Sequence, residues 1–179
     1  MIYYKDNELL IRNMEAADAR SFTKGEIAQG WKADISKYLT RLKDQTEGKC
    51  ISLTAVLKGI PVGYVNVYTT DRGDGAFSGK GLPEIVDFGV LEKYRRKGIG
   101  SKLLDVAEKI AGQYADVVYL SVGLHSGYGN AQRIYVKRGY IPDGTGVWYK
   151  GKPCAQYDTE IANDDDLVLF FSKRLKQEK

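Results

Sequence analysis

The 179-residue sequence is long enough for a substantial core, so we expect residues 1–179 to form a single domain. Its formal net charge of +4 is too small to argue for a nucleic-acid partner, and no apolar run is long enough to cross a membrane. With no signal peptide at its start, two cysteines (Cys50 and Cys154) and one histidine (His125), the sequence predicts a reduced cytoplasmic protein without a disulfide framework or a metal site.

The N-terminal part is predicted to contain a strand and two helices. Residues 9–11 are an apolar run that indicates the first strand. In the helix that follows, Asp18 lies in the first turn, where an acidic side chain suits the helix dipole. A second helix is expected over residues 31–47, between Gly30 and Gly48. The positions expected on the buried sides are Ala16, Ala19 and Phe22 in the first helix, and Ile35, Tyr38, Leu39 and Leu42 in the second.

A β-hairpin and a glycine-rich segment are expected next. Two β-rich runs, residues 50–57 and 62–69, flank a turn that contains Gly59 and Pro61. The second run alternates, so its two tyrosines share one face. Residues 71–81 lack the first glycine and the Ser/Thr of a phosphate-binding P-loop, so we interpret them as a mobile surface loop.

The central stretch is a predicted strand, a basic turn with glycines, and a helix. Residues 85–91 form an apolar, partly β-branched run that is typical of a buried strand. A basic turn over residues 95–100 follows, and apolar residues then recur at helical spacing over residues 99–114. This order aims several backbone N–H groups and the positive end of a helix at one point, which favours an anion site. The site is not the dinucleotide fingerprint, because Leu103 stands where a third glycine or alanine is needed.

The remaining chain is predicted to contain two more strands, a helix and a loop or hairpin. Residues 117–122 indicate a buried strand that pairs in parallel with the central strand, which gives a right-handed β–α–β unit. The next helix ends before Gly139, a suitable residue just past a helix C-terminus. Residues 144–151 indicate a loop or hairpin, and residues 167–171 indicate a strong final strand.

Two motifs resemble those of the GNAT superfamily of N-acetyltransferases. Arg95-x-x-Gly98-x-Gly100 resembles the superfamily's pyrophosphate-binding motif, Gln/Arg-x-x-Gly-x-Gly/Ala, and it lies between a strand and a long helix. The second signature is matched in its alanine, tyrosine, lysine and glycine by Ala131-x-x-Ile134-Tyr135-x-Lys137-x-Gly139-Tyr140. Tyr128 occupies the position of that signature's asparagine, so the cofactor contact of the asparagine is not transferred to this chain.

The resemblance covers nearly the whole chain and implies a fold and a cosubstrate. The implied fold is α/β (α+β), with a mixed, mostly antiparallel central sheet, a β–α–β acetyl-CoA-binding core and flanking helices. The turn would bind the pyrophosphate of acetyl-CoA, the strand would pair with the pantetheine arm, and the backbone N–H of Val90 would polarise the thioester carbonyl. The implied cofactor-binding residues are Phe88, Gly89, Val90, Arg95, Arg96, Lys97, Gly98, Ile99, Gly100 and Ser101.

Acetyl transfer to an amine needs a route for a proton and a stabilised leaving thiolate. Deprotonating a lysine-like amine at pH 7 costs roughly 4–5 kcal/mol, so a base or a water chain has to remove the proton. Glu84 matches the glutamate of the histone-acetyltransferase branch and is the first candidate base, while Asp87 and a water route remain open. Glu84 and Asp87 face opposite sides of a regular strand unless a bulge intervenes. Tyr135 occupies the family's acid position and would donate to the thiolate of CoA.

These observations predict an N-acetyltransferase that moves the acetyl group of acetyl-CoA directly to a primary amine, with a small molecule favoured as the acceptor. Two alternatives remain open: an acyl-CoA-binding sensor or partner subunit without turnover, and an acetyltransferase acting on protein N-termini or lysines. No metal is expected, and a homodimer is left open by the resemblance. One acidic cluster could attract a cationic amine or be a solvated turn, and it comprises Asp158, Glu160, Asp164, Asp165 and Asp166.

Overall fold

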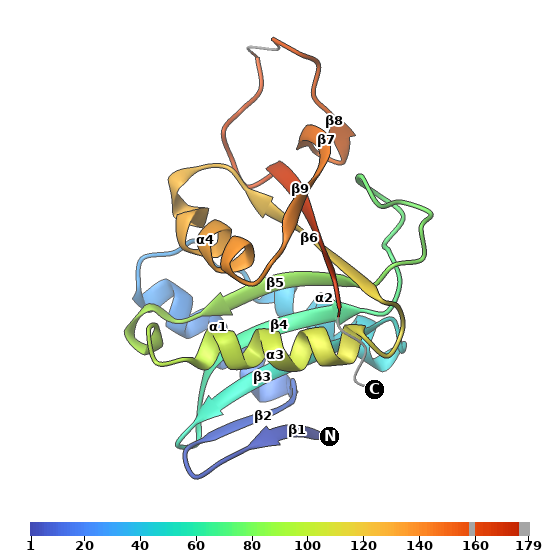
Figure 1. The fold of residues 1–179 in the computed structure, drawn as a ribbon. Helices are drawn as coiled ribbons and strands as arrows, with labels where there is room; N and C mark the ends of the chain where they lie inside the picture. Colours follow the sequence, from blue (N-terminus) through green and yellow to red (C-terminus); the bar gives the residue numbers. More distant parts are fainter. Residues whose placement is uncertain (158–159, 176–179) are drawn as a thin grey trace.

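The computed structural model describes residues 1–157 and 160–175, and in these residues nine strands form one sheet (Figure 1). The order across the sheet is β1-β2-β3-β4-β5-β6-β9-β7-β8. Every neighbouring pair is antiparallel except β5 and β6, so the sheet is mixed and mostly antiparallel, as predicted. The strands are β1 (Ile2–Lys5), β2 (Leu9–Asn13), β3 (Cys50–Leu57), β4 (Ile60–Tyr68), β5 (Glu84–Val90), β6 (Val117–Gly123), β7 (Ile141–Tyr149), β8 (Lys152–Pro153) and β9 (Leu167–Arg174).

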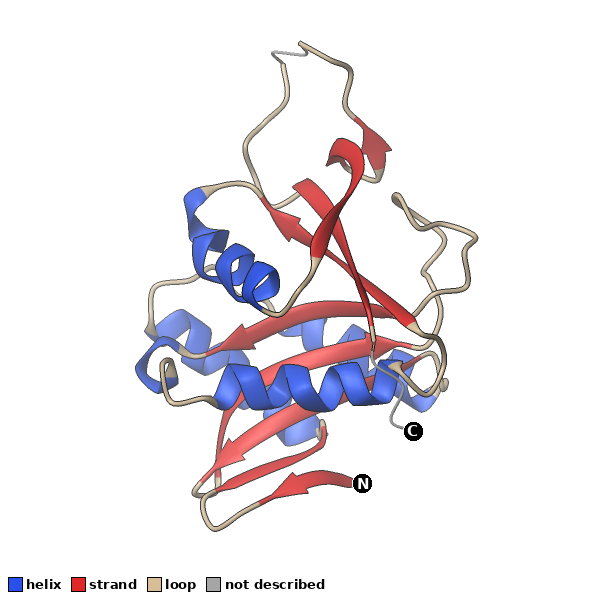
Figure 2. Cartoon of the chain, viewed as in Figure 1, coloured by secondary structure: helices blue, strands red, loops and turns tan. Residues whose placement is uncertain are grey.

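Four α-helices in the same residues flank the sheet (Figure 2). In the view of Figure 1, α1 (Ala16–Ala28) and α2 (Ile35–Thr46) lie behind it and α3 (Ile99–Ala111) crosses its front. Helix α4 (Gly129–Lys137) lies beside the region where β5 and β6 separate. The 3-10 turns η1 (Glu92–Tyr94) and η2 (Ser126–Tyr128) precede α3 and α4. Throughout the described residues, every helix is too short or too polar to span a membrane.

The N-terminal prediction was incomplete at two points. An edge strand, β1, precedes the predicted first strand and pairs with β2. Helix α2 begins at Ile35 rather than at Trp31, because the Asp34 carboxylate accepts a hydrogen bond from the Ser36 backbone N–H at 2.7 Å and caps the helix there. Leu39, predicted to be buried, is 49 % exposed, and Tyr38 is the buried residue of this helix.

The predicted hairpin is confirmed as β3 and β4. β3 has the predicted bounds, and β4 begins two residues before the predicted run. Lys58 and Gly59 form the turn with φ values of 49° and 82°, and positive φ at both positions is what a two-residue turn of the I′ type requires. This turn sets the pairing of Leu57 with Ile60, and an irregularity between Ala55 and Val56 then shifts the register so that Cys50 lies opposite Tyr68.

Two hydrophobic layers hold the helices to the sheet. On the α3 side, apolar residues of α3 such as Leu103 pack against strand residues such as Val65. On the other side, the rings of Phe22 in α1 and Tyr38 in α2 lie 4.9 and 5.2 Å from the Tyr64 ring of β4. Aromatic pairs at such distances add to the stabilisation from apolar burial. Helices α1 and α2 are therefore fixed against β4, next to the central strand.

The glycine-rich segment at residues 71–81 is a loop, as predicted, but it is anchored. The Asp71 carboxylate accepts hydrogen bonds from the backbone N–H groups of Gly73, Gly79 and Gly81 at 2.7–3.1 Å. The Phe77 ring stacks on the Tyr119 ring of β6, with their centroids 4.5 Å apart. The prediction of a mobile loop missed these contacts because they join the segment to itself and to a distant strand.

The C-terminal strands complete the sheet beyond β6. β9 lies between β6 and β7 and extends three residues past the predicted final strand. The predicted loop or hairpin near residues 144–151 is the end of β7, a turn at Lys150 and Gly151, and the short strand β8. Because β9 pairs with β6 along its whole length, it supports the strand that diverges from β5.

Candidate active site

The central feature is the separation of β5 from β6. The two strands pair in parallel where Glu84 lies opposite Tyr119, and they diverge toward Val90 (Figure 1). Helix α3 connects them, so the predicted β–α–β unit is present. The divergence leaves Phe88, Gly89 and Val90 partly exposed on the central strand. This is the strand that the resemblance implied would pair with the pantetheine arm of acetyl-CoA.

A bulge at Asp87 changes the faces of β5. Asp87 has a φ of 53°, and the register of β5 with β4 shifts at this point. Glu84 lies directly opposite Tyr68 of β4, and the Tyr68 hydroxyl accepts a hydrogen bond from Nη1 of Arg41 in α2 at 2.7 Å. The Asp87 carboxylate contacts Nε of the same Arg41 at 2.6 Å. The bulge thus brings both candidate bases to the α2 side, whereas a regular strand would have separated them.

The turn before α3 has the geometry of an anion site. Gly98 precedes the helix with a φ of 78°, and no side chain within the described residues caps the first turn. The first backbone N–H groups of a helix have no partner inside the helix, so those of α3 are available to a ligand. No atom lies within 4 Å of the position that a Cβ at Gly98 would take. At Gly100, a Cβ would lie 3.0 Å from Phe88 Cζ, so this glycine allows close packing of α3 on β5.

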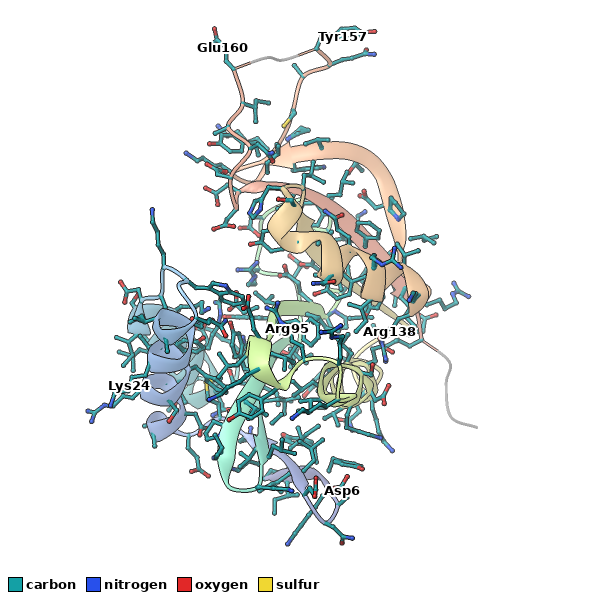
Figure 3. The ribbon with its side chains drawn as sticks, turned by 90° about the vertical axis from the view of Figure 1, so that its left-hand side faces the viewer. Asp6, Lys24, Arg95, Arg138, Tyr157 and Glu160 are labelled. Atoms are coloured by element: carbon teal, nitrogen blue, oxygen red, sulfur yellow. The ribbon has the colours of Figure 1, made fainter. Side chains whose placement is uncertain are left out.

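The three basic side chains of this turn differ in their roles. Figure 3 shows Arg95 between α1 and α3. Its Nε donates to the carbonyl oxygen of Val90 at 3.0 Å, and its guanidinium lies 5.1 Å from the centre of the Trp31 ring. Arg95 therefore fastens the turn to the end of β5. Arg96 and Lys97 are exposed and are the side chains that a phosphate could reach.

Glu84 is fully engaged by one partner. Its side chain is 3 % exposed, and its two carboxylate oxygens accept hydrogen bonds from Nε and Nη2 of Arg72 at 2.7 and 3.0 Å. Arg72 belongs to the anchored loop, and such a two-point pair between guanidinium and carboxylate is strong and specific in geometry. A proton acceptor needs an accessible lone pair, and this arrangement offers Glu84 little opportunity to serve as one.

Asp87 is engaged on one side only. Its Oδ2 contacts Nε of Arg41 and, at 3.3 Å, Nδ2 of Asn66. Its Oδ1 accepts no hydrogen bond from any described residue, and the side chain is 22 % exposed. Asp87 therefore combines an oriented carboxylate with a free oxygen at the bulge, where β5 and β6 have already separated.

Tyr135 lies in α4, across the divergence from β5. Its ring centre is 6.1 Å from that of Phe88 and 5.7 Å from that of Tyr140. Burial, reinforced by the nearby Tyr128 and Asp87, raises the pKa of the Tyr135 phenol above its usual range. Its hydroxyl donates to no group among the described residues, so it is available to a ligand.

The acidic cluster of the C-terminal loop is partly consumed by contacts within the protein. The Asp165 carboxylate accepts hydrogen bonds from the Tyr128 hydroxyl and from Nε2 of His125, both at 2.9 Å. Nδ1 of His125 accepts from the Gly127 backbone N–H, so Nε2 has to be the protonated nitrogen. Asp164 accepts from the Tyr149 hydroxyl at 3.2 Å. Asp158 lies outside the described residues.

Sequence reasoning missed the two arginines that hold the carboxylates. Arg41 lies three positions after Tyr38 on α2, a spacing that could have placed it on the side facing the sheet. Arg72 gave no such signal, because its segment has no regular structure. Their partners lie 46 and 12 positions away in sequence, and only the fold brings them together.

Comparison with known proteins gives one family match. A family model described as the acetyltransferase (GNAT) family matches residues 12–140, which span β2 to the end of α4 and include the basic turn, Asp87 and Tyr135. A search of the curated proteins finds no match.

Solved structures match along nearly the full length. An acetyltransferase of Salmonella typhimurium that modifies the N-terminal serine of ribosomal protein L7/L12 superposes with a TM-score of 0.71 at 8 % identity, covering 98 % of this chain and 100 % of its own. The Ard1 protein of Thermoplasma volcanium gives 0.67 at 19 % identity, with 95 % and 99 % covered. The acetyltransferase yncA of Salmonella typhimurium, solved with acetyl-CoA, gives 0.66 at 16 % identity, with 96 % of both chains covered. At these identities the likeness concerns the fold.

Proposed function

Since the chain belongs to the GNAT family of acetyltransferases and so uses acetyl-CoA as its acetyl donor, we propose that it transfers the acetyl group directly to a primary amine of a small molecule. The observation that supports this most is the combination at the β5–β6 divergence. An uncapped helix N-terminus with open space at Gly98, a carboxylate with a free oxygen at Asp87 and an unpaired hydroxyl at Tyr135 all border it.

The turn before α3 would hold the pyrophosphate of acetyl-CoA. Its backbone N–H groups over Ile99–Ser101 would donate to the phosphate oxygens, and Arg96 and Lys97 would add positive charge. The exposed part of β5, Phe88–Val90, would accompany the pantetheine arm, with the Val90 N–H directed at the thioester carbonyl. Acetyl-CoA supplies an activated acyl group, and the remaining chemistry belongs to the side chains of this chain.

For the proton of the acceptor amine we favour Asp87 over Glu84. Asp87 has a carboxylate oxygen without a partner in the described residues, whereas both oxygens of Glu84 are bound by Arg72. Arg41 would hold Asp87 in one orientation while its other oxygen accepts the proton, directly or through a water. Glu84 would then act through Arg72, by fixing the anchored loop beside the central strand.

Tyr135 would stabilise the leaving thiolate as a hydrogen-bond donor. Its phenol already has a higher reference pKa than a thiol, by about 1.5 units, and burial raises the pKa of Tyr135 further. Complete transfer of its proton to the thiolate is therefore unfavourable, while donation of a hydrogen bond is not. Its ring lies 6.1 Å from that of Phe88 on the central strand, and Asp87 is near enough to contribute to its raised pKa.

The test is CoA release from acetyl-CoA across an amine panel of amino acids, polyamines, aminoglycosides and peptides with free N-termini. Release that depends on a small amine, and that falls in both Asp87→Asn and Tyr135→Phe, is expected. Turnover on peptides alone would point instead to a protein acetyltransferase. Acetyl-CoA binding without turnover on any amine would contradict the proposed transfer and favour a sensor.

A further inference from the structure

A polar hollow of about 510 Å³ is lined in part by Arg41 and Arg72, the two arginines that hold the carboxylates of β5. This volume is in the range of small-molecule sites. Two arginines, one lysine and two aspartates contribute to the wall, so its character is charged rather than apolar. The residues that line it are Arg41, Asp44, Lys49, Tyr68, Thr70, Asp71 and Arg72.

Both arginines of the wall surround one tyrosine ring. The guanidinium carbons of Arg41 and Arg72 each lie 5.4 Å from the centre of the Tyr68 ring, so they are at most twice that distance apart. Arg41 reaches from the hollow to Asp87, and Arg72 reaches from the hollow to Glu84. The hollow is therefore separated from each candidate base by a single guanidinium.

The two guanidiniums retain unused donors. Arg41 donates through Nε to Asp87 and through Nη1 to Tyr68, which leaves Nη2 without an acceptor among the described residues. Arg72 donates through Nε and Nη2 to Glu84, which leaves its Nη1 without an acceptor among the described residues. Each of these nitrogens has two N–H groups, and a guanidinium has no acceptor of its own. A ligand at this wall has to offer acceptor atoms.

The acidic side chains of the wall are largely occupied. Asp71 receives three backbone N–H groups of its own loop. One oxygen of Asp44 accepts from the Tyr68 hydroxyl and lies 3.8 Å from Nη1 of Arg41. The unused hydrogen-bonding capacity of the wall is therefore weighted toward donors, which suits a carboxylate.

We propose that this hollow binds an anionic group, a carboxylate in the first place, carried by the acceptor amine. The inference rests on the proposed function and specifies its substrate class: an amine that bears an acid. With the acid at the free nitrogens of Arg41 and Arg72, the amine extends past Arg41 toward Asp87. In this arrangement the acid of the ligand lies at Arg41 and its amine lies at Asp87, so each charge of the ligand faces the opposite charge of the protein.

The experiment compares each acid with its own amide. The acceptors are glycine, β-alanine, 4-aminobutyrate and 6-aminohexanoate, each beside the corresponding primary amide, with kcat/KM for CoA release as the readout. The series varies the distance between amine and acid, so one member should be preferred. At that spacing the acid is expected to exceed its amide by about 10- to 100-fold, the range for hydrogen bonds to a charged group.

The variants replace the guanidinium of Arg72. Their readout is the ratio of kcat/KM for the acid to that for its amide, because a general loss of activity affects both values equally. In Arg72→Lys the ratio should fall, because the forked donor is lost while the charge remains. The double variant Arg72→Met with Glu84→Leu removes the whole ion pair, leaves no buried charge behind, and should lower the ratio further, to the part that Arg41 supplies. Lys43→Gln is the control, since Lys43 is an exposed cation of α2, the helix that carries Arg41, and lies outside the hollow wall.

Three results would overturn the inference. Amides used as well as acids at every spacing would show that the hollow takes no part in recognition, while the transferase function would stand. An equal ratio of acid to amide in the wild type and in the double variant would also show that the hollow takes no part in recognition. Stimulation of the amides by free inorganic phosphate would assign the hollow to a separate anion rather than to the acceptor.

A binding measurement separates failure of the inference from failure of the proposed function. If no amine is acetylated, calorimetry with N-acetyl-glycine and its longer homologues against their amides, in the presence of CoA, still probes the hollow. Preferential binding of the acids that is reduced in the double variant supports the inference without turnover. Equal binding of acids and amides overturns it.

Discussion

Glu84→Gln and Asp87→Asn should have opposite consequences, although both replace a carboxylate of the same strand by an amide. Glu84 is buried in a two-point ion pair, so its replacement leaves the guanidinium of Arg72 without a counter-charge. Removing one partner of a buried pair typically costs 3–5 kcal/mol; since the Arg72 side chain is 32 % exposed, we expect about 2–3 kcal/mol. At a urea m-value of about 2 kcal/mol per molar, the unfolding midpoint should fall by about 1–1.5 M.

The loss of activity should be larger in Asp87→Asn than in Glu84→Gln, which is the reverse of their expected losses of stability. Asp87→Asn removes the proposed proton acceptor, and kcat/KM should fall by about 10²- to 10⁴-fold. Its stability should change by less than about 1.5 kcal/mol, because Arg41 keeps the Asp44 carboxylate 3.8 Å from its Nη1, keeps the Tyr68 hydroxyl, and can still donate to the amide oxygen. For Glu84→Gln, activity per folded molecule should stay within about threefold of the wild type, less than 1 kcal/mol in the barrier.

The assay pairs urea unfolding, followed by circular dichroism, with CoA release corrected for the folded fraction. The double variant Glu84→Leu with Arg72→Met is the structural control, since replacing both partners of a buried pair by apolar residues restores most of the lost stability. A large loss of activity in folded Glu84→Gln, with Asp87→Asn nearly unaffected, would refute the reasoning and return the role of base to Glu84.

Two further predictions concern the tyrosines. Tyr135→Phe removes only a hydroxyl without a protein partner among the described residues, so kcat should fall by about 10- to 100-fold while thermal unfolding stays unchanged; an unchanged kcat would exclude Tyr135 from the reaction. Burial raises the pKa of several tyrosines above 10, so the folded state keeps protons that the unfolded state releases, and the free energy of unfolding should fall above pH 10 by about 1.4 kcal/mol per unit and tyrosine. The part of the tyrosinate absorbance that these buried tyrosines contribute should therefore rise in a cooperative step that coincides with unfolding, whereas complete titration of all 13 tyrosines in an intact fold would contradict this. The tyrosines concerned are Tyr38, Tyr64, Tyr119, Tyr135 and Tyr140.

The features predicted well from the sequence are those that local chemistry decides. The hairpin followed from two β-rich runs around a short turn, and in the structure Lys58 and Gly59 of that turn take positive φ. The turn before α3 followed from two glycines between an apolar strand and an amphipathic helix. Each of these signals lies within a few residues, so no knowledge of the fold was needed.

The features that were missed depend on contacts between distant segments. β1 has an exposed end and becomes a strand only through pairing with β2. The bulge at Asp87 was foreseen as an option, but its effect on the two carboxylates depends on Arg41 and Arg72, which other segments supply. The identity of the proton acceptor is therefore a question that only the assembled site could address.

The most direct test of the account is calorimetric titration of acetyl-CoA into Gly98→Ala and Gly59→Ala beside the wild type. Both glycines lie in turns, with φ of 78° and 82°, and neither has an atom within 4 Å of the added Cβ, so the backbone strain of about 1–2 kcal/mol is matched. Only Gly98 lies at the N-terminus of α3. We predict one acetyl-CoA per chain, with affinity at least about tenfold weaker in Gly98→Ala and unchanged in Gly59→Ala. No binding by the wild type, or equal binding by both variants, would contradict the assignment of this turn as the acetyl-CoA site.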